Sequence, residues 1–309
     1  MEAGAAERMG AGAAERMGAG AAMSGRERAR HWRHPGLPGV DLLDARYVRK
    51  TFARHTHESF VIAAITSGVE EFHHRDSIER AGAGHLALVN PDTVHTGQAG
   101  VPEGWTYSVI YPSAAVVGEI AAETTSIRGN PGFSVAVTHD PHAVRLITQV
   151  LRAADGQNAL AADTMLRLVV ARLLRSSGTS LPARPARAAA PRDASRAREI
   201  LESRMAAPPS LRELAAELGA GPFALLRAFR DAYGMPPHAW LTDARVRRAR
   251  HLLDSGVSPA DAAVTVGFTD QPHLNRHFTR IVGVPPGAYR RERKNVQDTR
   301  KAADLTSAG

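Results

Sequence analysis

The chain has 309 residues, a formal net charge of +8 and no cysteine. This length accommodates two ordinary domains, and the absence of cysteine excludes disulfides, thiolate zinc sites and cysteine nucleophiles. The basic charge suits a polyanionic partner. No apolar run approaches the roughly 18 residues of a membrane span, so we expect a soluble, cytoplasmic protein with no membrane partner.

The chain begins with a repeated Ala/Gly-rich octad, whose first copy covers residues 3–10. Alanine and glycine in this ratio offer little apolar surface to bury. We therefore expect residues 1–29 to be disordered. Ordinary sequence starts at Met23, which leaves open whether translation begins at Met1 or near Met23.

Short strand-like segments alternate with turn signals between about residues 46 and 137. The expected strands cover residues 60–66, 70–74, 86–89 and 106–111. Turn residues such as Ser67-Gly68 separate them. Short and regularly spaced strands favour an all-β barrel or sandwich.

Two stretches with the apolar spacing of helices follow, at 141–154 and 159–175. Their apolar faces exceed what covering one side of a small barrel requires. We therefore predict that they pair two chains into a homodimer, with Ile147 and Val150 in the interface. Residues 176–192 are rich in Ser, Gly, Pro, Ala and Arg, a composition that predicts a linker.

The chain beyond this linker contains the same unit twice. Ser210–Gly219 returns 48 positions later as Ser258–Gly267, and the match continues after one inserted residue. In each copy a Ser caps a helix, a Gly ends it, and the second helix carries a Leu and a Phe four residues apart. A duplicated helix-turn-helix predicts DNA binding, because the second helix of such a unit enters the major groove.

The duplicated region resembles the AraC/XylS family of bacterial transcription regulators. The residues that carry the likeness are Ala249, Leu252, Leu253, Ala262, Ala263, Val266, Gly267, Phe268, Leu274, Arg276, Phe278, Gly283, Pro285, Pro286 and Tyr289. The resemblance implies an all-α domain at 193–293, whose two helix-turn-helix units are joined by a long helix at 239–254, and a tail at 294–309. It also implies that double-stranded promoter DNA and RNA polymerase are partners, and most relatives activate transcription. We expect Arg247, on the joining helix, to contact a phosphate.

The β region resembles the small-molecule-binding cupin domain at the N-terminus of many AraC-type regulators. The match rests on the motifs at 54–58, 66–68 and 84–95. It implies that residues 30–175 form an effector-binding and dimerisation domain. The fold class expected for the chain is an N-terminal all-β cupin-like barrel followed by α-helices, then a C-terminal all-α domain with two helix-turn-helix units.

His55, His57 and His95 have the spacing by which enzymatic cupins hold a metal ion. Three interpretations stay open: a three-histidine metal site, polar groups of an effector pocket, or structural histidines bonded inside the barrel. We assign them to an effector pocket, because a sensing site needs a few polar groups in an apolar cavity. Trp105 and Tyr107 stack on the ligand or lie in the core. No metal, cofactor or catalytic residue is assigned.

The positions expected to read bases lie on the second helices, away from the buried Leu and Phe. They are Phe223, Leu226, Arg227, Gln271, Pro272, Asn275 and Arg276. Arginine suits guanine and Asn or Gln suits adenine, whereas Phe223 and Leu226 meet thymine methyls or fill the core. Phosphate contacts or ion pairs within the protein are the alternatives for Arg227 and Arg276.

The sequence therefore predicts a DNA-binding transcriptional regulator, an activator that responds to a small-molecule effector. The alternative is a metal-dependent cupin enzyme fused to a DNA-binding domain.

Overall fold

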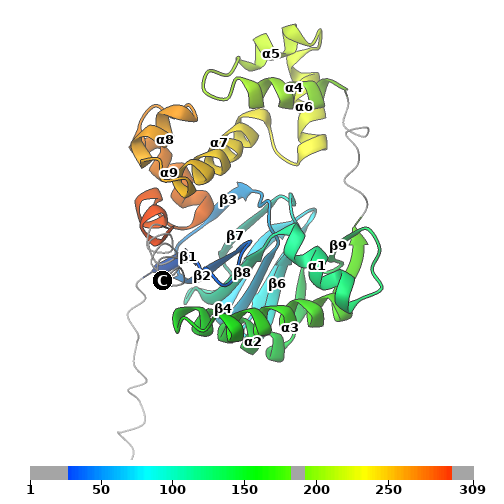
Figure 1. The fold of residues 1–309 in the computed structure, drawn as a ribbon. Coiled ribbons are helices and arrows are strands. Elements are labelled where there is room, and N and C mark those ends of the chain that lie inside the picture. Colours follow the sequence, from blue (N-terminus) through cyan, green and yellow to red (C-terminus); the bar gives the residue numbers. More distant parts are fainter. Residues whose placement is uncertain (1–26, 182–191, 294–309) are drawn as a thin grey trace, which may run out of the picture.

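The structure, a computed structural model, describes residues 27–181 and 192–293 (Figure 1). A β-rich N-terminal unit and an all-α C-terminal unit lie against each other. This confirms the predicted fold class. Most of the tract predicted to be disordered, residues 182–191 of the predicted linker and the predicted tail lie outside the described residues.

The N-terminal unit is built on a sheet of order β1-β2-β8-β4-β6-β10, to which β3, β5 and β7 are added through pairing with β4 or with each other. Its strands are β1 (Arg28–Arg33), β2 (Val40–Tyr47), β3 (Phe52–His55), β4 (Val61–His74), β5 (Ser77–Gly82), β6 (His85–Val89), β7 (His95–Ala99), β8 (Trp105–Pro112), β9 (Asn130–Phe133), β10 (Val137–His139) and β11 (Gly178–Leu181). Its helices are α1 (Ala114–Thr124), α2 (Pro141–Asp155) and α3 (Ala159–Ser177).

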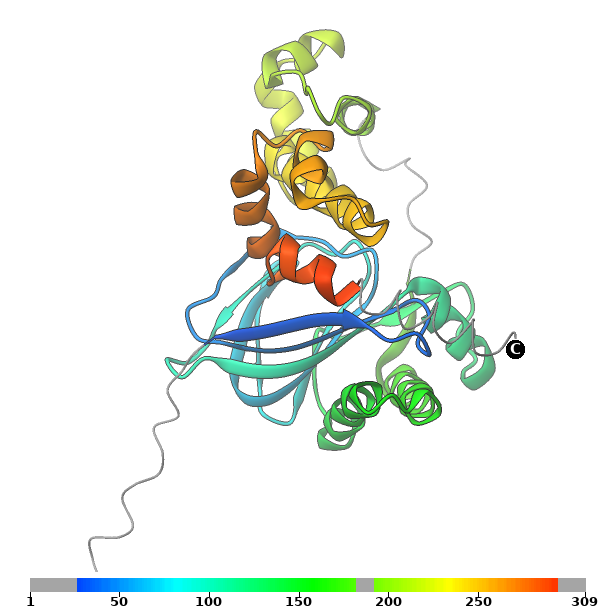
Figure 2. The same ribbon diagram turned by 60° about the vertical axis from the view of Figure 1, so that its left-hand side comes forward.

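The two faces of this sheet belong to two different cores, because side chains alternate along a strand. On β4, Ile62 and Ala64 pack against the helices α1–α3, whereas Val61, Ala63 and Ile65 point to the opposite face. The strands β2, β6 and β8 divide their apolar residues in the same way. Both faces are therefore buried, one under helices and one around the interior of the β unit (Figure 2).

The two strands predicted at 60–66 and 70–74 are one long strand, β4. Ser67-Gly68 is a bulge rather than a turn, because the register of β4 on β8 shifts between Ile65 and Ser67 and Gly68 has a φ of +70°. The first half of β4 pairs with β6, and its second half pairs with β5 and β7. The bulge thus bends one strand so that it serves both parts of the sheet.

The N-terminal unit is longer than predicted at both ends. Strand β1 starts at Arg28, inside the tract predicted to be disordered, because it pairs with β2 along its whole length. At the other end α3 runs through Ser177 and β11 pairs with β9, so the unit reaches Leu181 instead of residue 175. Both additions depend on pairing with distant strands, which local composition does not reveal.

The helices α2 and α3 cover the sheet rather than pair two chains through the predicted residues. Ile147 and Val150 have no exposed surface and pack in the core between α2, α3 and the sheet. The prediction that these two residues form a dimer interface is therefore wrong, since the sheet face under α2 is itself apolar. On α3, Leu160 and Leu168 are exposed.

The C-terminal unit confirms the duplicated helix-turn-helix. Its helices are α4 (Arg192–Ser203), α5 (Leu211–Glu217), α6 (Pro222–Tyr233), α7 (Pro237–Asp254), α8 (Pro259–Thr265) and α9 (Gln271–Val282). Ser210 forms a capping box with Glu213 at the start of α5, and Ser258 caps α8. The helices α5–α6 and α8–α9 form the two units, α7 joins them, and residues 286–293 are again helical.

Each helix-turn-helix unit has its own core. Leu225 and Phe229 of α6 pack with α4, α5 and the first half of α7, whereas Leu274 and Phe278 of α9 pack with α8 and the second half of α7. Of the helices in the described ranges, none has both the length and the apolarity needed to span a membrane.

The bulge at Gly68 gives a direct test of the β architecture. A Cβ atom there would collide with the carbonyl oxygen of Gly104, and the backbone is in the left-handed region. We expect Gly68→Ala to lower the free energy of unfolding by about 2 kcal/mol or more. In helix α1, a Cβ at Gly118 meets nothing within 4 Å, so Gly118→Ala is expected to be neutral or to stabilise by up to about 1 kcal/mol. Urea denaturation of both variants measures this, and equal stabilities would contradict the bulge.

Candidate effector cavity and DNA-reading helices

A cavity lies inside the β unit, and the C-terminal unit forms part of its wall. Its polar lining consists of His55, His57, Glu70, His95, Thr96, Tyr107 and Tyr111. Apolar strand residues such as Val61 and Ala63 complete the wall, and Ile281 and Val282, from the last turn of the recognition helix α9, line it as well. The volume of the cavity is about 40 Å³, enough for about three water molecules.

The three histidines meet in this cavity. His55 ends β3 and His95 starts β7, and these two residues are direct partners in the antiparallel pair. His57 follows His55 by two residues, and one ring nitrogen from each histidine lies within 4.8 Å of the others. Burial lowers the pKa of each ring, most strongly for His57 and His95. All three imidazoles are therefore neutral at pH 7.

The same cavity holds a buried carboxyl group. Glu70 of β4 is 8% exposed, and burial raises its pKa to about 8. None of the lining residues is a Lys or Arg that would offset its charge. A carboxyl in such surroundings favours its protonated form at neutral pH.

Tyr107 and Trp105 have different surroundings. Tyr107 lines the cavity, and burial raises the pKa of its hydroxyl well above the usual value. Trp105 lies outside the lining and has no exposed surface, and its ring packs against Tyr47 at 5.3 Å and Tyr107 at 5.9 Å. The structure thus gives Trp105 a core position behind the cavity wall. Sequence reasoning missed Glu70 and Tyr111, although Glu70 is an acidic residue inside a predicted strand.

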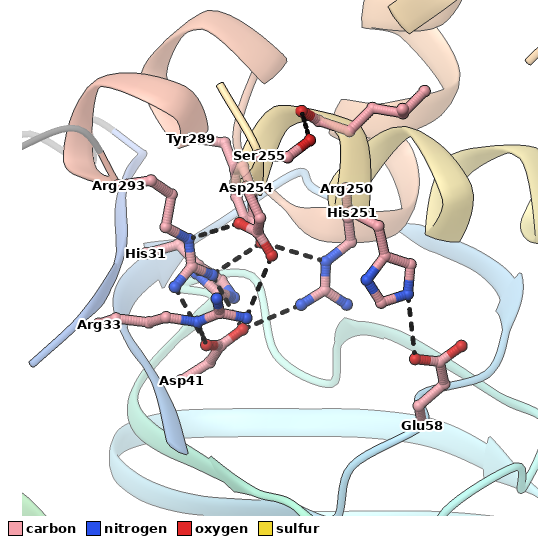
Figure 3. Close-up of polar contacts among 11 residues, drawn as sticks. His31, Arg33, Asp41, Glu58, Arg250, His251, Asp254, Ser255, Tyr289 and Arg293 are labelled. Carbon is pink, nitrogen blue, oxygen red and sulfur yellow. Dashed lines mark hydrogen bonds and ion pairs between the residues drawn. The ribbon is translucent and has the colours of Figure 1, made fainter. Parts of the chain in front are cut away.

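The two units are joined by a buried cluster of charges around Asp41 of β2 (Figure 3). Arg293 donates to both carboxylate oxygens at 3.0 and 2.9 Å, and Arg250 of α7 donates at 3.0 Å. Arg33 of β1 also donates to Asp41, and Asp254 pairs with Arg33 at 3.1 Å and Arg293 at 3.3 Å. We call these five residues the Asp41 clamp.

The Asp41 clamp is held by complementary charge around a buried carboxylate. Asp41 and Arg293 are 7% and 4% exposed. Burial alone would raise the pKa of Asp41, but the guanidinium groups of Arg293, Arg250 and Arg33 together hold it well below its usual range. Removing one partner from a buried ion pair costs about 3–5 kcal/mol, because the remaining charge stays buried.

Helix α7 turns one polar face toward the β unit. This face consists of Asp243, Arg247, Arg250 and Asp254, spaced four, three and four residues apart. Thr56, which lies between His55 and His57, donates to Asp243 at 2.8 Å and accepts from Arg247 at 3.2 Å. The segment that carries two cavity histidines is therefore bonded directly to the helix that joins the two helix-turn-helix units.

Arg247 is thus engaged within the protein, and its predicted phosphate contact is not available in this arrangement.

The end of α9 is also fixed to the β unit. The hydroxyl of Tyr47 donates to the carbonyl oxygen of Gly283 at 3.3 Å, and the ammonium of Lys50 donates to the carbonyl oxygen of Thr279. Together with Ile281 and Val282, these contacts attach the C-terminal end of the second recognition helix to the wall of the cavity.

The predicted base-reading residues lie on α6 and α9, and most of them are exposed. The exposed ones are Phe223, Arg227, Gln271, Pro272 and Arg276, and the half-buried ones are Leu226 and Asn275. Phe223 is 78% exposed, so it does not fill the core. The Oδ1 atom of Asn275 is buried without a hydrogen-bond partner among the described residues.

Comparison with known proteins places both units in one family. Residues 37–174 match the model of the AraC-like ligand binding domain, and residues 214–292 match a helix-turn-helix domain model. The uncharacterized HTH-type transcriptional regulator YbfI of Bacillus subtilis is 28% identical over 232 residues, which cover 74% of this chain and 82% of that protein. The chain belongs to the AraC family of helix-turn-helix transcriptional regulators. It is therefore a DNA-binding regulator with a ligand-binding domain, from a non-enzymatic family, and the alternative of a cupin enzyme is not supported.

The chain is also similar to other regulators and to a solved structure. The HTH-type transcriptional regulator MtrA of Neisseria gonorrhoeae is 35% identical over 22% of this chain and 23% of its own. The virulence regulon transcriptional activator VirF of Yersinia enterocolitica is 32% identical over 26% of this chain and 30% of its own. The crystal structure of ToxT from Vibrio cholerae O395 aligns with a TM-score of 0.48 at 12% identity, over 86% of this chain and 97% of that one.

The buried Glu70 makes stability depend on pH. The folded protein keeps a proton on Glu70 that the unfolded chain releases, since the folded pKa is raised from 4.5 to about 8. Stability therefore falls as the pH rises through this window, by up to about 5 kcal/mol. We expect Glu70→Gln to flatten this fall, whereas Glu71→Gln, on the opposite face of β4, keeps it. Urea midpoints at pH 5.5 and 8 measure the slope, and an unchanged slope in Glu70→Gln would contradict the assignment.

Proposed function

We propose that this regulator is an activator and that the molecule bound in the cavity determines its affinity for promoter DNA. One observation carries the proposal: Ile281 and Val282 of the recognition helix α9 form part of the cavity wall. An occupant that moves this wall moves a DNA-reading helix. The proposed effector-binding residues are His55, His57, His95 and Tyr107, together with Glu70 and Tyr111 of the same lining. Trp105 does not contact the effector in this proposal but packs behind the cavity wall.

The size of the cavity supports this coupling. Organic ligands usually occupy about 300–1,000 Å³, whereas the cavity volume is about 40 Å³. An organic effector therefore needs the C-terminal unit to shift away from the cavity mouth. Effector binding and the contact between the units are then coupled. In allosteric proteins the coupling free energy is typically about 1–3 kcal/mol.

The DNA-reading part of the proposal rests on exposure and chemistry. Phe223, Leu226 and Arg227 of α6 would read one major-groove segment, with the apolar pair on thymine methyls. Gln271, Pro272, Asn275 and Arg276 of α9 would read the next one. Because α7 joins the two helices rigidly, we expect the segments to lie about 34–36 Å apart.

Domain limits, activation and dimerisation complete the proposal. The apolar cores of the C-terminal unit come almost entirely from its own helices, so we expect residues 193–293 to fold alone.

Activation through RNA polymerase is supported by the similarity to VirF, which is named a transcriptional activator. We also infer that the chain forms a homodimer, with the exposed apolar residues Leu160 and Leu168 of α3 in its interface.

Coupling is tested by filling the cavity from the β side. Ala63 of β4 lines the cavity, and Ala63→Leu inserts side-chain atoms toward Ile281 and Val282. We expect the Kd for a duplex obtained by binding-site selection to change at least fivefold, which corresponds to about 1 kcal/mol. Thr66→Leu adds an apolar side chain at an exposed position of the same strand and should leave the Kd unchanged. Fluorescence anisotropy measures both, and a folded Ala63→Leu protein with wild-type affinity would refute the coupling.

Base reading is tested by the two exposed arginines. Arg227→Ala and Arg276→Ala should each cost about 1–3 kcal/mol of binding and relax the preference at one base pair. Arg145→Ala removes the same charge from an exposed position on α2, in the β unit, and should preserve the sequence preference. The measurement is a binding-site selection with each variant. Unchanged preferences in both recognition-helix variants would mean that these arginines contact the backbone.

The dimer is tested on α3. Leu168→Arg should give folded monomers in sedimentation velocity, because the side chain is exposed and its loss does not disturb the core. Ile147→Asp should instead unfold the β unit, because it buries a carboxylate in the core. A folded Leu168→Arg protein that remains dimeric would place the interface elsewhere.

A further inference from the structure

The hydrogen bonds of the three cavity histidines fix where their protons are. Nδ1 of His55 lies 2.7 Å from the carbonyl oxygen of Ala53, and Nδ1 of His95 lies 3.0 Å from that of Thr93. A carbonyl oxygen only accepts, so both Nδ1 atoms carry the ring proton and both Nε2 atoms keep a free lone pair. This tautomer, with Nδ1 bonded to a carbonyl, is the one that second-sphere contacts select in metal-ligating histidines.

The third ring cannot satisfy both lone pairs. Nε2 of His57 lies 3.1 Å from Nε2 of His55, and the His57 ring centroid is 5.1 Å from that of His95. A neutral imidazole has a single N–H, so His57 can donate to one neighbour at most. At least one ring nitrogen facing the cavity is then left without a donor from these three rings. A cation at their centre would accept all the lone pairs at once.

The remaining cavity also suits a cation. Its volume of about 40 Å³ fits an ion with one or two waters but not an organic effector. The carboxyl group of Glu70 is nine-tenths buried and lines the same space, and the described residues provide it with no hydrogen bond or ion pair. A buried carboxylate without a partner is costly, and a nearby cation removes that cost.

We propose that His55, His57 and His95 bind a divalent first-row transition-metal ion of the zinc type through their Nε2 atoms. Imidazole ligands suit Zn²⁺, Ni²⁺, Cu²⁺ and Fe²⁺ rather than Mg²⁺ or Ca²⁺, and a three-ligand site leaves the fourth position to water. Zn–N bonds of about 2.0–2.1 Å in a tetrahedron place ligand nitrogens about 3.3 Å apart. The 3.1 Å between His55 and His57 is close to this value, and the longest separation of 4.8 Å must shorten.

The ion would act on the contact between the units. Thr56, between two of the ligands, is bonded to Asp243 and Arg247 of α7, so drawing the rings together pulls on α7. This inference deepens the proposed function, because it names the ligand of the same cavity and rests on the cavity being the sensing site. Metal binding itself is measured without DNA, so its failure and a failure of the coupling are separate results.

The test uses the full chain, dialysed against a chelator and titrated with Zn²⁺ in a calorimeter. Co²⁺ serves as a spectroscopic probe, because a tetrahedral site gives visible d–d absorption. We expect one ion per chain, and at least a tenfold weaker affinity in His57→Gln and in His95→Gln. His73→Gln changes an exposed histidine of β4 that does not face the cavity and should bind as wild type.

Thermal melts show whether each variant is folded. If one glutamine variant fails to fold, the affinity of the other variant decides the test. The Co²⁺ spectra of wild type and His73→Gln, which should be the same, are compared as an independent measurement. No saturable binding to wild type, or binding that His57→Gln and His95→Gln leave unchanged, would overturn the proposal. Neither result would affect the Ala63→Leu coupling experiment.

Discussion

One carboxylate, that of Asp41, determines how the two units of this AraC-family regulator lie together. It is buried on β2 and accepts hydrogen bonds from Arg33 of its own unit and from Arg250 and Arg293 of the DNA-binding unit. Three guanidinium groups around one buried carboxylate are stable only if enough negative charge lies among them. Asp41 and Asp254 are the two carboxylates that the described clamp provides.

The positions of α7 and α9 follow from this clamp. With Arg250 held, the polar face of α7 lies on the β unit, and its Asp243 and Arg247 contact Thr56 beside the cavity histidines. The last turn of α9 then reaches the cavity, where Ile281 and Val282 form part of its wall. The residues expected to read bases on α6 and α9 stay largely exposed. A chemical event inside the β unit is therefore connected by contact to the elements that read DNA.

Much of the fold was predictable because it depends on local patterns. The repeat from Ser210 to Ser258, its capping residues and its left-handed glycines specify the helix-turn-helix units without reference to the rest of the chain. The spacing of His55, His57 and His95 likewise indicated that they would meet. Local patterns failed where distant pairing decided the outcome. Strand β1 requires β2, β11 requires β9, and the bulge at Gly68 is visible only against Gly104.

The contact between the units was the part that the sequence did not reveal. Asp41 is more than 200 positions away from Arg250 and Arg293, and nothing local marks an aspartate in a strand as the partner of three arginines. Arg247 of α7 suggested a phosphate contact, because a basic helix between two helix-turn-helix units is a plausible site for DNA phosphates. The structure uses Arg245 for the carbonyl oxygen of Met205 and Arg247 for Thr56.

The most direct test of this view is the distance between the units with and without the charge on Asp41. The chain has no cysteine, so Thr66→Cys and Thr265→Cys, both exposed, place one spin label on each unit. Pulsed EPR should give a single narrow distance distribution, which Asp41→Asn broadens because three guanidinium groups then share only Asp254. Asp44→Asn, at a more exposed carboxylate on the same strand, should keep the narrow distribution. An equally narrow distribution in Asp41→Asn would contradict the dependence of the arrangement on this carboxylate.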